Sequence, residues 1–269
     1  MNGIRNIMNK QKYEQPNNSK GCLITAFDTD EYSYSTLAVA AADRVVKHLN
    51  IPVTIVTDKS IDTEHAQLIV ERPKNNPRYP MGKPPSDWYN LIRTSLYDLS
   101  PYDRTLIIDC DLMLSTDNLK PYVDSSADFL IAGNIYDPKQ GLPTYQLQIG
   151  HSQIAMTWAT IMIFNKSKEA YAIFEMAKLV RNNYGYYSNL YGFLPSPIRN
   201  DYLFSIACHL IGGYGLKSYT INLPLVNCNK QVEYKSFDND QLTYQYVDDK
   251  IYLNKIKNMD LHLMNKNQL

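Results

Sequence analysis

The segment Arg104-Thr-Leu-Ile-Ile-Asp-Cys-Asp-Leu-Met-Leu114 decides the predicted fold of this chain. Four residues typical of a buried strand, 105–108, run directly into two carboxylates, Asp109 and Asp111, which are separated by one residue. On an extended backbone, residues i and i+2 point the same way, so both carboxylates can reach one point beyond the strand end. Two negative charges held that close repel each other unless a cation neutralises them, and hard oxygen ligands suit Mg²⁺ or Mn²⁺. The segment therefore predicts a divalent-metal site, and a strand-end turn that contains acidic residues is the simpler alternative.

The composition limits the classes of protein to consider. The chain has 269 residues, of which 44% are hydrophobic, so it can bury a large core as one or two domains. Lys and Arg balance Asp and Glu at 27 each, so no overall basic field argues for a nucleic-acid or membrane partner. The four cysteines show no paired C-x-x-C spacing, which argues against a zinc site and a disulfide scaffold. No apolar run is long enough for a membrane span and no signal peptide precedes residue 21, so we expect a cytoplasmic protein.

The first third of the chain predicts an α/β fold. Residues 21–27 form a nearly continuous apolar run, which is typical of a strand covered on both faces. Leu37, Ala41, Val45 and Leu49 recur at four-residue spacing, which indicates a helix with one buried face. Residues 52–57 read as a second buried strand. This β-α-β order implies a right-handed crossover and a largely parallel, twisted central sheet.

The rest of the chain is predicted in less detail. Further strands are expected at 67–70, 128–132, 160–164 and 259–264, with a small hairpin within 229–250. Helices are expected at 87–99, 168–181 and 201–211. The proline-rich segment 73–85 and the segments 136–153 and 182–197 are expected to be irregular, the last of them as a long loop beside an acceptor.

Five stretches, taken in order, carry a resemblance to a known family. They begin at Leu23-Ile-Thr-Ala-Phe-Asp28 and continue with Leu99-Ser-Pro-Tyr-Asp-Arg104 and the strand to Asp111, Ile161-Met-Ile-Phe-Asn165, Asn200-Asp-Tyr-Leu-Phe204, and a C-terminal strand that reaches His262. In this order they resemble the nucleotide-sugar glycosyltransferases of the GT-A fold, and within them the retaining group that includes glycogenin and the bacterial lipopolysaccharide galactosyltransferases. The chain departs from that pattern at Trp158-Ala-Thr160, at Tyr202 and in the ending His262-Leu-Met-Asn-Lys266.

The resemblance implies an activity and a set of site residues. It implies an α/β GT-A-like single domain that transfers a sugar from a nucleoside diphosphate donor, UDP-sugar above all, to an acceptor hydroxyl with retention. It implies 20–269 as the catalytic domain, with 20–115 as its nucleotide-binding half and 116–269 as its acceptor half. Residues 1–19, rich in Asn, Gln and Lys, have little apolar surface to bury, so we expect a flexible tail there. Mn²⁺ or Mg²⁺ would be held by Asp109, Asp111 and His262.

Further roles follow from the same resemblance. Asp201 and Asn165 would serve catalysis, although Asp201 also has a sufficient structural reason to exist as a helix N-cap. The donor would be contacted by residues from both halves of the chain: Thr25, Ala26, Phe27, Asp28, Tyr32 or Tyr34, Arg93, Asp109 and Lys266. For Arg93, an ordinary surface position is the alternative.

Two other functions compete with the transferase. A nucleotidyltransferase also uses paired aspartates on a similar sheet, but its glycine-rich basic loop is replaced here by the acidic Asp28-Thr-Asp-Glu31. An inactive GT-A-like binding module would explain the departures at Trp158-Ala-Thr160 and Tyr202. The acceptor stays open among a glycan, a protein and a modified DNA base, and DNA would require a basic groove, for which Arg72, Lys74, Arg78 and Lys83 are the candidates.

Overall fold

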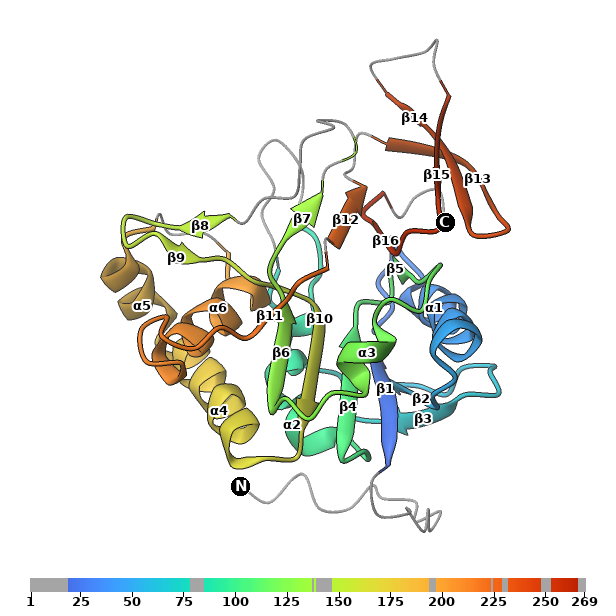
Figure 1. The fold of residues 1–269 in the computed structure, drawn as a ribbon. Coiled ribbons are helices and arrows are strands. Elements are labelled where there is room, and N and C mark those ends of the chain that lie inside the picture. The colour runs from blue at the N-terminus through green and yellow to red at the C-terminus, as the bar shows by residue number, and fades with distance from the viewer. Residues whose placement is uncertain are drawn as a thin grey trace.

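A seven-stranded sheet forms the centre of the molecule, in the order β11-β6-β10-β4-β1-β2-β3 (Figure 1). The computed structural model describes residues 19–77, 85–136, 138, 147–193, 197–223, 225–228, 232–247 and 253–265. The strands of this sheet are β1 (Lys20–Thr25), β2 (Val53–Thr57), β3 (Ala66–Ile69), β4 (Arg104–Ile108), β6 (Phe129–Ala132), β10 (Trp158–Asn165) and β11 (Thr220–Ile221). Neighbouring strands are parallel except at β10, which runs antiparallel to both β4 and β6. The predicted α/β class with a mostly parallel central sheet is confirmed.

Helices cover the sheet as their apolar patterns require. Helix α1 (Tyr34–Leu49) buries all four residues of the predicted stripe and packs against β1 and β2. Helices α4 (Lys168–Asn182) and α6 (Asn200–Ile211) pack against each other, and α6 also lies on β10 (Figure 1). Helix α4 begins at a true cap, because the Ser167 side chain accepts a hydrogen bond from the Ala170 amide at 3.2 Å.

Two predicted segments differ from the structure. Residues 87–99 were expected to form one helix, but they fold as a 3₁₀ helix, η1 (Asn90–Ser95), followed by one turn of α-helix, α2 (Leu96–Leu99). In a 3₁₀ helix, residues i and i+3 lie on the same face, so this winding aims Asn90 and Arg93 at one target. Part of the expected loop at 182–197 is helix α5 (Tyr184–Tyr191), which ends at Gly192 with φ of 68°, a conformation that glycine adopts without steric cost.

Two smaller sheets bring the C-terminal part of the chain to the strand that ends at Asp109. The first has the order β5-β16-β12-β7, with β5 (Leu112–Met113), β16 (Leu261–Leu263), β12 (Leu225–Cys228) and β7 (Ile135–Tyr136). The second has the order β13-β14-β15, with β13 (Val232–Asp238), β14 (Gln241–Tyr246) and β15 (Asn254–Lys257), and its first two strands form the predicted hairpin. The remaining short elements are α3 (Lys120–Val123), β8 (Gln148–Ile149) and β9 (Ile154–Ala155). Among the described residues, no helix combines the length and the apolar character that crossing a bilayer would need.

The hairpin turn is fastened to helix α1 by charge. Asp240 lies between β13 and β14, and its carboxylate contacts Arg44 Nη1 and Lys47 Nζ, each at 2.8 Å. His48 Nε2 lies 3.4 Å from the same carboxylate. The hydrogen bond from Lys47, and next the one from Arg44, lower the pKa of Asp240 to about 2 although its partial burial acts in the opposite direction. The three-stranded sheet is thus held to the α/β body by a group that is ionised at neutral pH.

Candidate metal and transfer site

Asp109, Asp111 and His262 converge at the carboxyl end of β4. Asp109 follows β4 directly, Asp111 precedes β5, and His262 lies in β16, where it pairs with Leu112 of β5. One ligand atom from each side chain lies within 4.8 Å of the other two. His262 Nε2 is 3.4 Å from Asp111 Oδ1 and 4.0 Å from Asp109 Oδ2. The strand-end pair seen in the sequence and the distant histidine therefore face one point.

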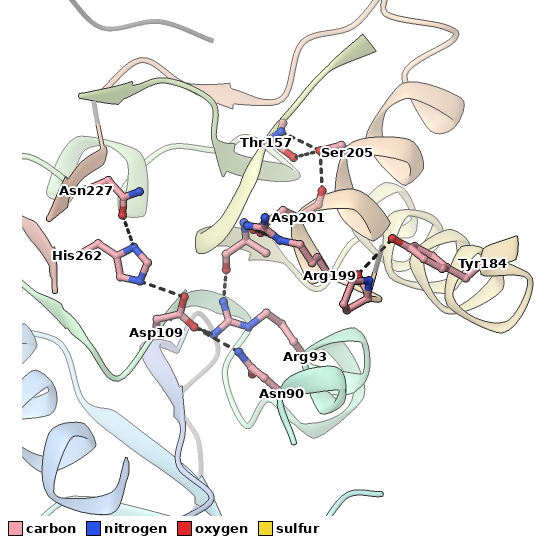
Figure 2. Close-up of polar contacts among 12 residues, drawn as sticks. Asn90, Arg93, Asp109, Thr157, Tyr184, Arg199, Asp201, Ser205, Asn227 and His262 are labelled. Carbon is pink, nitrogen blue, oxygen red and sulfur yellow. Dashed lines mark hydrogen bonds and ion pairs between the residues drawn. The ribbon is translucent and has the colours of Figure 1, made fainter. Parts of the chain in front are cut away.

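Asn227 orients the imidazole of His262 (Figure 2). The two residues are paired across β12 and β16, and Asn227 Oδ1 lies 2.9 Å from His262 Nδ1. Because an amide oxygen can only accept, Nδ1 donates in this contact, and Nε2 is the ring nitrogen directed at the two carboxylates. Two carboxylates and one neutral imidazole form a donor set that fits Mn²⁺, and a hydrogen-bonded second nitrogen is usual for a metal-binding histidine. Sequence reasoning missed Asn227, because only the pairing of strands 35 residues apart reveals it.

Arg93 holds the other side of Asp109 (Figure 2). Its side chain is 1% exposed, and its Nη2 donates to Asp109 Oδ1 while its Nη1 donates to the carbonyl oxygen of Ala159. Asn90 Nδ2 lies 3.5 Å from the same Asp109 oxygen. The alternative of an ordinary surface arginine is wrong. With Oδ1 occupied by these donors, Asp109 presents Oδ2 toward His262.

Asp201 joins this network through the backbone of Ala159. Asp201 Oδ1 accepts a hydrogen bond from the Ala159 amide at 3.0 Å, and Arg199 Nη2 donates to Asp201 Oδ2 at 2.7 Å. The backbone of Ala159 therefore contacts Arg93 through its carbonyl oxygen and Asp201 through its amide, so the two peptide groups that flank this residue link both side chains. Helix α6 has Arg199 at its N-cap position, so the expected N-cap role of Asp201 is wrong: Asp201 is the second helical residue. Burial acts to lower the pKa of Arg199, but the charge and the hydrogen bond of Asp201, together with Tyr202 and Tyr184, raise that pKa above its usual value.

Asn165 lies away from this site. Strand β10 runs antiparallel to β4, so Asn165 pairs with Arg104 at the start of β4, whereas Ile161 pairs with Ile108 at its end. At about 3.3 Å per residue, this places Asn165 roughly 15 Å from the carboxylates. Its amide donates to the carbonyl oxygens of Ser126 and Ala127, at 3.3 Å each, and so holds the turn before β6. The expected catalytic role of Asn165 is corrected accordingly, and Lys266 lies outside the described residues.

Some of the groups expected to hold the nucleotide already form hydrogen bonds within the protein. Ala26 and Phe27 are buried, and the Ala26 amide donates to Val56 O at 2.9 Å, so this amide has a partner within the sheet. Thr25 Oγ1 contacts Asn90 Oδ1 at 3.1 Å. These contacts place Thr25 next to the residue that reaches Asp109.

The loop after β1 is tied down by Asp28. Its carboxylate accepts hydrogen bonds from the Ser35 amide at 2.7 Å and the Ser35 hydroxyl at 2.9 Å, and it forms an ion pair with Lys59 at 2.6 Å. Burial acts to raise the pKa of Asp28, but Lys59 and Ser35 together lower it below its usual value. The rings of Tyr32 and Tyr34 meet edge to face at 5.9 Å between centroids. Asp28 thus shapes the loop that carries the two tyrosines rather than presenting a free carboxylate.

Of the candidate basic cluster, the structure describes Arg72 and Lys74, and Arg72 is paired with a carboxylate. Arg72 forms an ion pair with Asp58, and its guanidinium lies 4.9 Å from the centroid of the Tyr89 ring. Arg78 and Lys83 fall outside the described residues. The described part of this cluster gives no support to a basic groove for DNA.

Comparisons with known proteins give a likeness at the level of the fold. No protein-family model matches the chain, and no curated protein matches its sequence. The structure is similar to the glycosyltransferase GlyE of Streptococcus pneumoniae TIGR4, with 9% identity, a TM-score of 0.44, and coverage of 77% of this chain and 46% of that one. It is also similar to the galactosyltransferase LgtC crystallised with donor and acceptor sugar analogs, with 14% identity, a TM-score of 0.45, and coverage of 69% of this chain and 70% of that one. A third similar structure is mouse xyloside xylosyltransferase 1, with 10% identity, a TM-score of 0.43, and coverage of 76% of this chain and 85% of that one.

Two facts limit what this likeness means. The chain spans less than half the length of GlyE. At TM-scores below 0.5 and identities of at most 14%, the likeness carries no weight for function in any of the three cases. The side chains around Asp109 and Asp201 therefore carry the functional assignment.

Proposed function

We propose that this chain is a metal-dependent glycosyltransferase that moves a sugar from a nucleoside diphosphate, with UDP as the expected nucleotide, to an acceptor hydroxyl. The observation that supports it is the convergence of Asp109, Asp111 and His262 within 4.8 Å at the carboxyl end of β4. In open α/β sheets, ligands bind beyond the carboxyl ends of the strands. Paired carboxylates at this position suit a cation that is completed by substrate phosphates. The two-part organisation, 20–115 for the donor and 116–269 for the acceptor, belongs to the same proposal.

The proposed reaction exchanges one bond at the anomeric carbon for another. The bond from the anomeric carbon to the diphosphate oxygen breaks, and the nucleoside diphosphate leaves with the electron pair. The acceptor oxygen bonds to the anomeric carbon and gives its proton to the departing diphosphate. Asp109, Asp111 and His262 would hold a divalent cation, which would supply positive charge for the departing diphosphate. Arg93 fixes one oxygen of Asp109, and Asn227 fixes the tautomer of His262, so this chain prepares the ligand set before the donor arrives.

The surroundings of Asp201 favour retention of the anomeric configuration. One oxygen of Asp201 accepts from the Ala159 amide, and the other accepts from Arg199 at 2.7 Å and 3.2 Å. Both oxygens of Asp201 are therefore already engaged by donors of this chain, which leaves the carboxylate poorly placed to take a proton from the acceptor. It is better suited to stand as a fixed negative charge beside an oxocarbenium-like transition state. Asp201 is therefore proposed as an electrostatic group rather than as a general base.

The competing nucleotidyltransferase is disfavoured by the loop after β1. That loop contains Asp28, Asp30 and Glu31 and no glycine, and Thr29 donates its amide to Tyr32 O at 3.0 Å, so this amide is not free to cradle a phosphate. A triphosphate would meet negative charge there without the row of free amides that such enzymes offer. An inactive module is disfavoured because such a module has no need to hold Asp109 and His262 toward Asp111, as Arg93 and Asn227 do.

The deciding experiment measures nucleoside diphosphate release from a panel of nucleotide sugars with Mn²⁺. We expect release with at least one donor, loss of that release in EDTA and recovery when Mn²⁺ is restored. The matched control is Asp111→Asn, which keeps the size of the side chain and removes a charged ligand. Release that continues undiminished in EDTA would refute metal dependence. Proton NMR of the fresh product tests retention, because a product with the opposite anomeric configuration to the donor would assign an inverting reaction.

A further inference from the structure

Beyond Asp201, a row of aromatic rings extends from the candidate site toward helix α5. We call Tyr184, Phe193 and Tyr202 the aromatic strip. The Phe193 centroid lies 5.1 Å from that of Tyr202 and 6.0 Å from that of Tyr184. The Arg199 guanidinium lies 5.5 Å from the Tyr202 centroid and pairs with Asp201 (Figure 2). Each ring of the strip is partly buried, so it is fixed by packing and still reaches the surface.

Trp158, which lies next to the inner end of the strip, contains a polar atom for which the described residues offer no partner. Trp158 is 9% exposed, and its ring centroid lies 6.0 Å from the Arg199 guanidinium. Its indole Nε1 is buried and has no hydrogen-bond partner among the described residues. Buried donors of this kind are uncommon in folded proteins, and an unpaired one needs an explanation. A ligand hydroxyl placed beside Trp158 would supply the missing acceptor.

The strip carries no net charge. No Asp, Glu, Lys or Arg occurs between Arg181 and Arg199 in the sequence, and the charge of Arg199 is balanced by Asp201 at 2.7 Å. A phosphate-rich nucleic acid binds through cations that this surface does not offer. A neutral sugar suits it better, because the apolar C–H face of a sugar ring packs on an aromatic face and its hydroxyls reach the polar tips of the tyrosines.

We propose that the aromatic strip is the acceptor subsite and that its occupant is a neutral oligosaccharide, whose terminal hydroxyl lies toward Asp201. This inference rests on the proposed transferase function and adds the chemical class of the acceptor. It follows from three features: the strip is continuous with Asp201 through Arg199, its rings follow one another at 5 to 6 Å, and it is uncharged. A subsite made of several rings predicts that longer acceptors bind more tightly than a single sugar.

The test offers the donor together with three separate acceptor pools: neutral oligosaccharides, peptides and single-stranded DNA. We expect transfer to the oligosaccharides, and a lower acceptor KM for a trisaccharide than for its terminal monosaccharide. Tyr202→Ala should raise the trisaccharide KM roughly 2- to 10-fold, as expected for one lost aromatic contact, and should shrink the advantage of length. Tyr202→Phe keeps the ring and loses only the hydroxyl, so its trisaccharide KM should lie between those of the unaltered chain and Tyr202→Ala. If Tyr202→Ala fails to fold, Tyr184→Ala removes a ring at the outer end of the strip.

The matched control is Tyr186→Ala on helix α5, which also carries Tyr184 of the strip. Tyr186 is 65% exposed and its ring contacts Tyr187 rather than any ring of the strip, so its loss should leave the trisaccharide KM unchanged. Equal acceptor KM values for Tyr202→Ala and Tyr186→Ala, or transfer to peptides or DNA alone, would overturn the assignment of the strip. Hydrolysis of the donor without transfer to any oligosaccharide would also overturn it while leaving the transferase intact. Absence of donor hydrolysis with every nucleotide sugar would instead overturn the transferase proposal itself.

Discussion

Replacing Asn227 by alanine should weaken metal binding without removing a ligand. The substitution deletes the acceptor that lies 2.9 Å from His262 Nδ1. Loss of one ordinary hydrogen bond is worth about 0.5 to 1.5 kcal/mol, which alone weakens affinity roughly 2- to 13-fold. The ring would also be free to carry its proton on Nε2, the nitrogen that faces both carboxylates, and that tautomer cannot bind a cation. Outer partners of metal-bound histidines cost about 10- to 100-fold in affinity when removed, so we expect a loss in that range.

Isothermal titration of the protein with Mn²⁺ measures this effect directly and does not depend on turnover. Asn227→Asp keeps an acceptor for Nδ1 and should retain the affinity of the unaltered chain, whereas Asn118→Ala, at an exposed position, controls for asparagine loss in general. Thermal unfolding of all variants separates a local effect from a loss of fold. An Asn227→Ala affinity within twofold of the unaltered chain, with the fold intact, would show that the imidazole needs no partner and that the tautomer argument is wrong.

Three further predictions address the metal ligands, the buried arginine and the hairpin. Asp111→Asn should lower Mn²⁺ affinity by about 100-fold or more and nearly abolish turnover with little change in thermal stability; an unchanged titration would contradict the ligand assignment. Arg93→Met leaves the Asp109 carboxylate without its buried partner and should lower the free energy of unfolding in urea by on the order of 3 kcal/mol, and Arg93→Lys should recover only part of this because lysine lacks the fork that bridges two acceptors. Asp240→Asn should lower the free energy of unfolding by about 1 kcal/mol at pH 7. Because the pKa of Asp240 falls from 3.8 to about 2 on folding, that difference should be constant above pH 5 and should narrow as the pH falls through 3.8 toward 2; a difference independent of pH would remove the charge explanation.

The part of the site that sequence could predict is the part that depends on local geometry. The buried stripe of α1 follows from the helical repeat. Asp109 and Asp111 were correctly expected to meet, but not on an extended chain: β4 ends at Ile108, and residues 109–112 form a turn closed by the Leu112 amide, which donates to Asp109 O at 3.0 Å. His262 could be placed only through the family resemblance. Asn227 and the Ala159 amide could not be found, because their roles arise from the pairing of β12 with β16 and from the register shift between Trp158 and Met162 in β10.

The misplacement of Asn165 has a specific physical cause. A run of buried residues that ends in a polar residue has the same appearance in sequence whether the strand runs parallel or antiparallel to its neighbours. Direction alone decides which edge of the sheet receives that last residue, and β10 is antiparallel to β4. The prediction of a loop at 182–197 was wrong over residues 184–191 for a different reason. This Tyr-rich segment has modest helical propensity, but burial of Ser188 and Tyr191 and the glycine that ends the helix stabilise it as α5.

The peptide groups on either side of Ala159 make position 159 unusual as a target for mutation. Its carbonyl oxygen contacts Arg93 and its amide contacts Asp201. The residue is 1% exposed, and its methyl group takes no part in either hydrogen bond. A scan of side chains at this position would register only whether each fits the space, and would not reveal the link between the metal ligands and Asp201. Proline is the informative replacement, because it deletes the amide that Asp201 accepts while keeping the carbonyl for Arg93. Replacement of the amide by an ester at this one bond would sever the same link with no change in shape, so the coupling between the two halves of the site can be edited in the main chain alone.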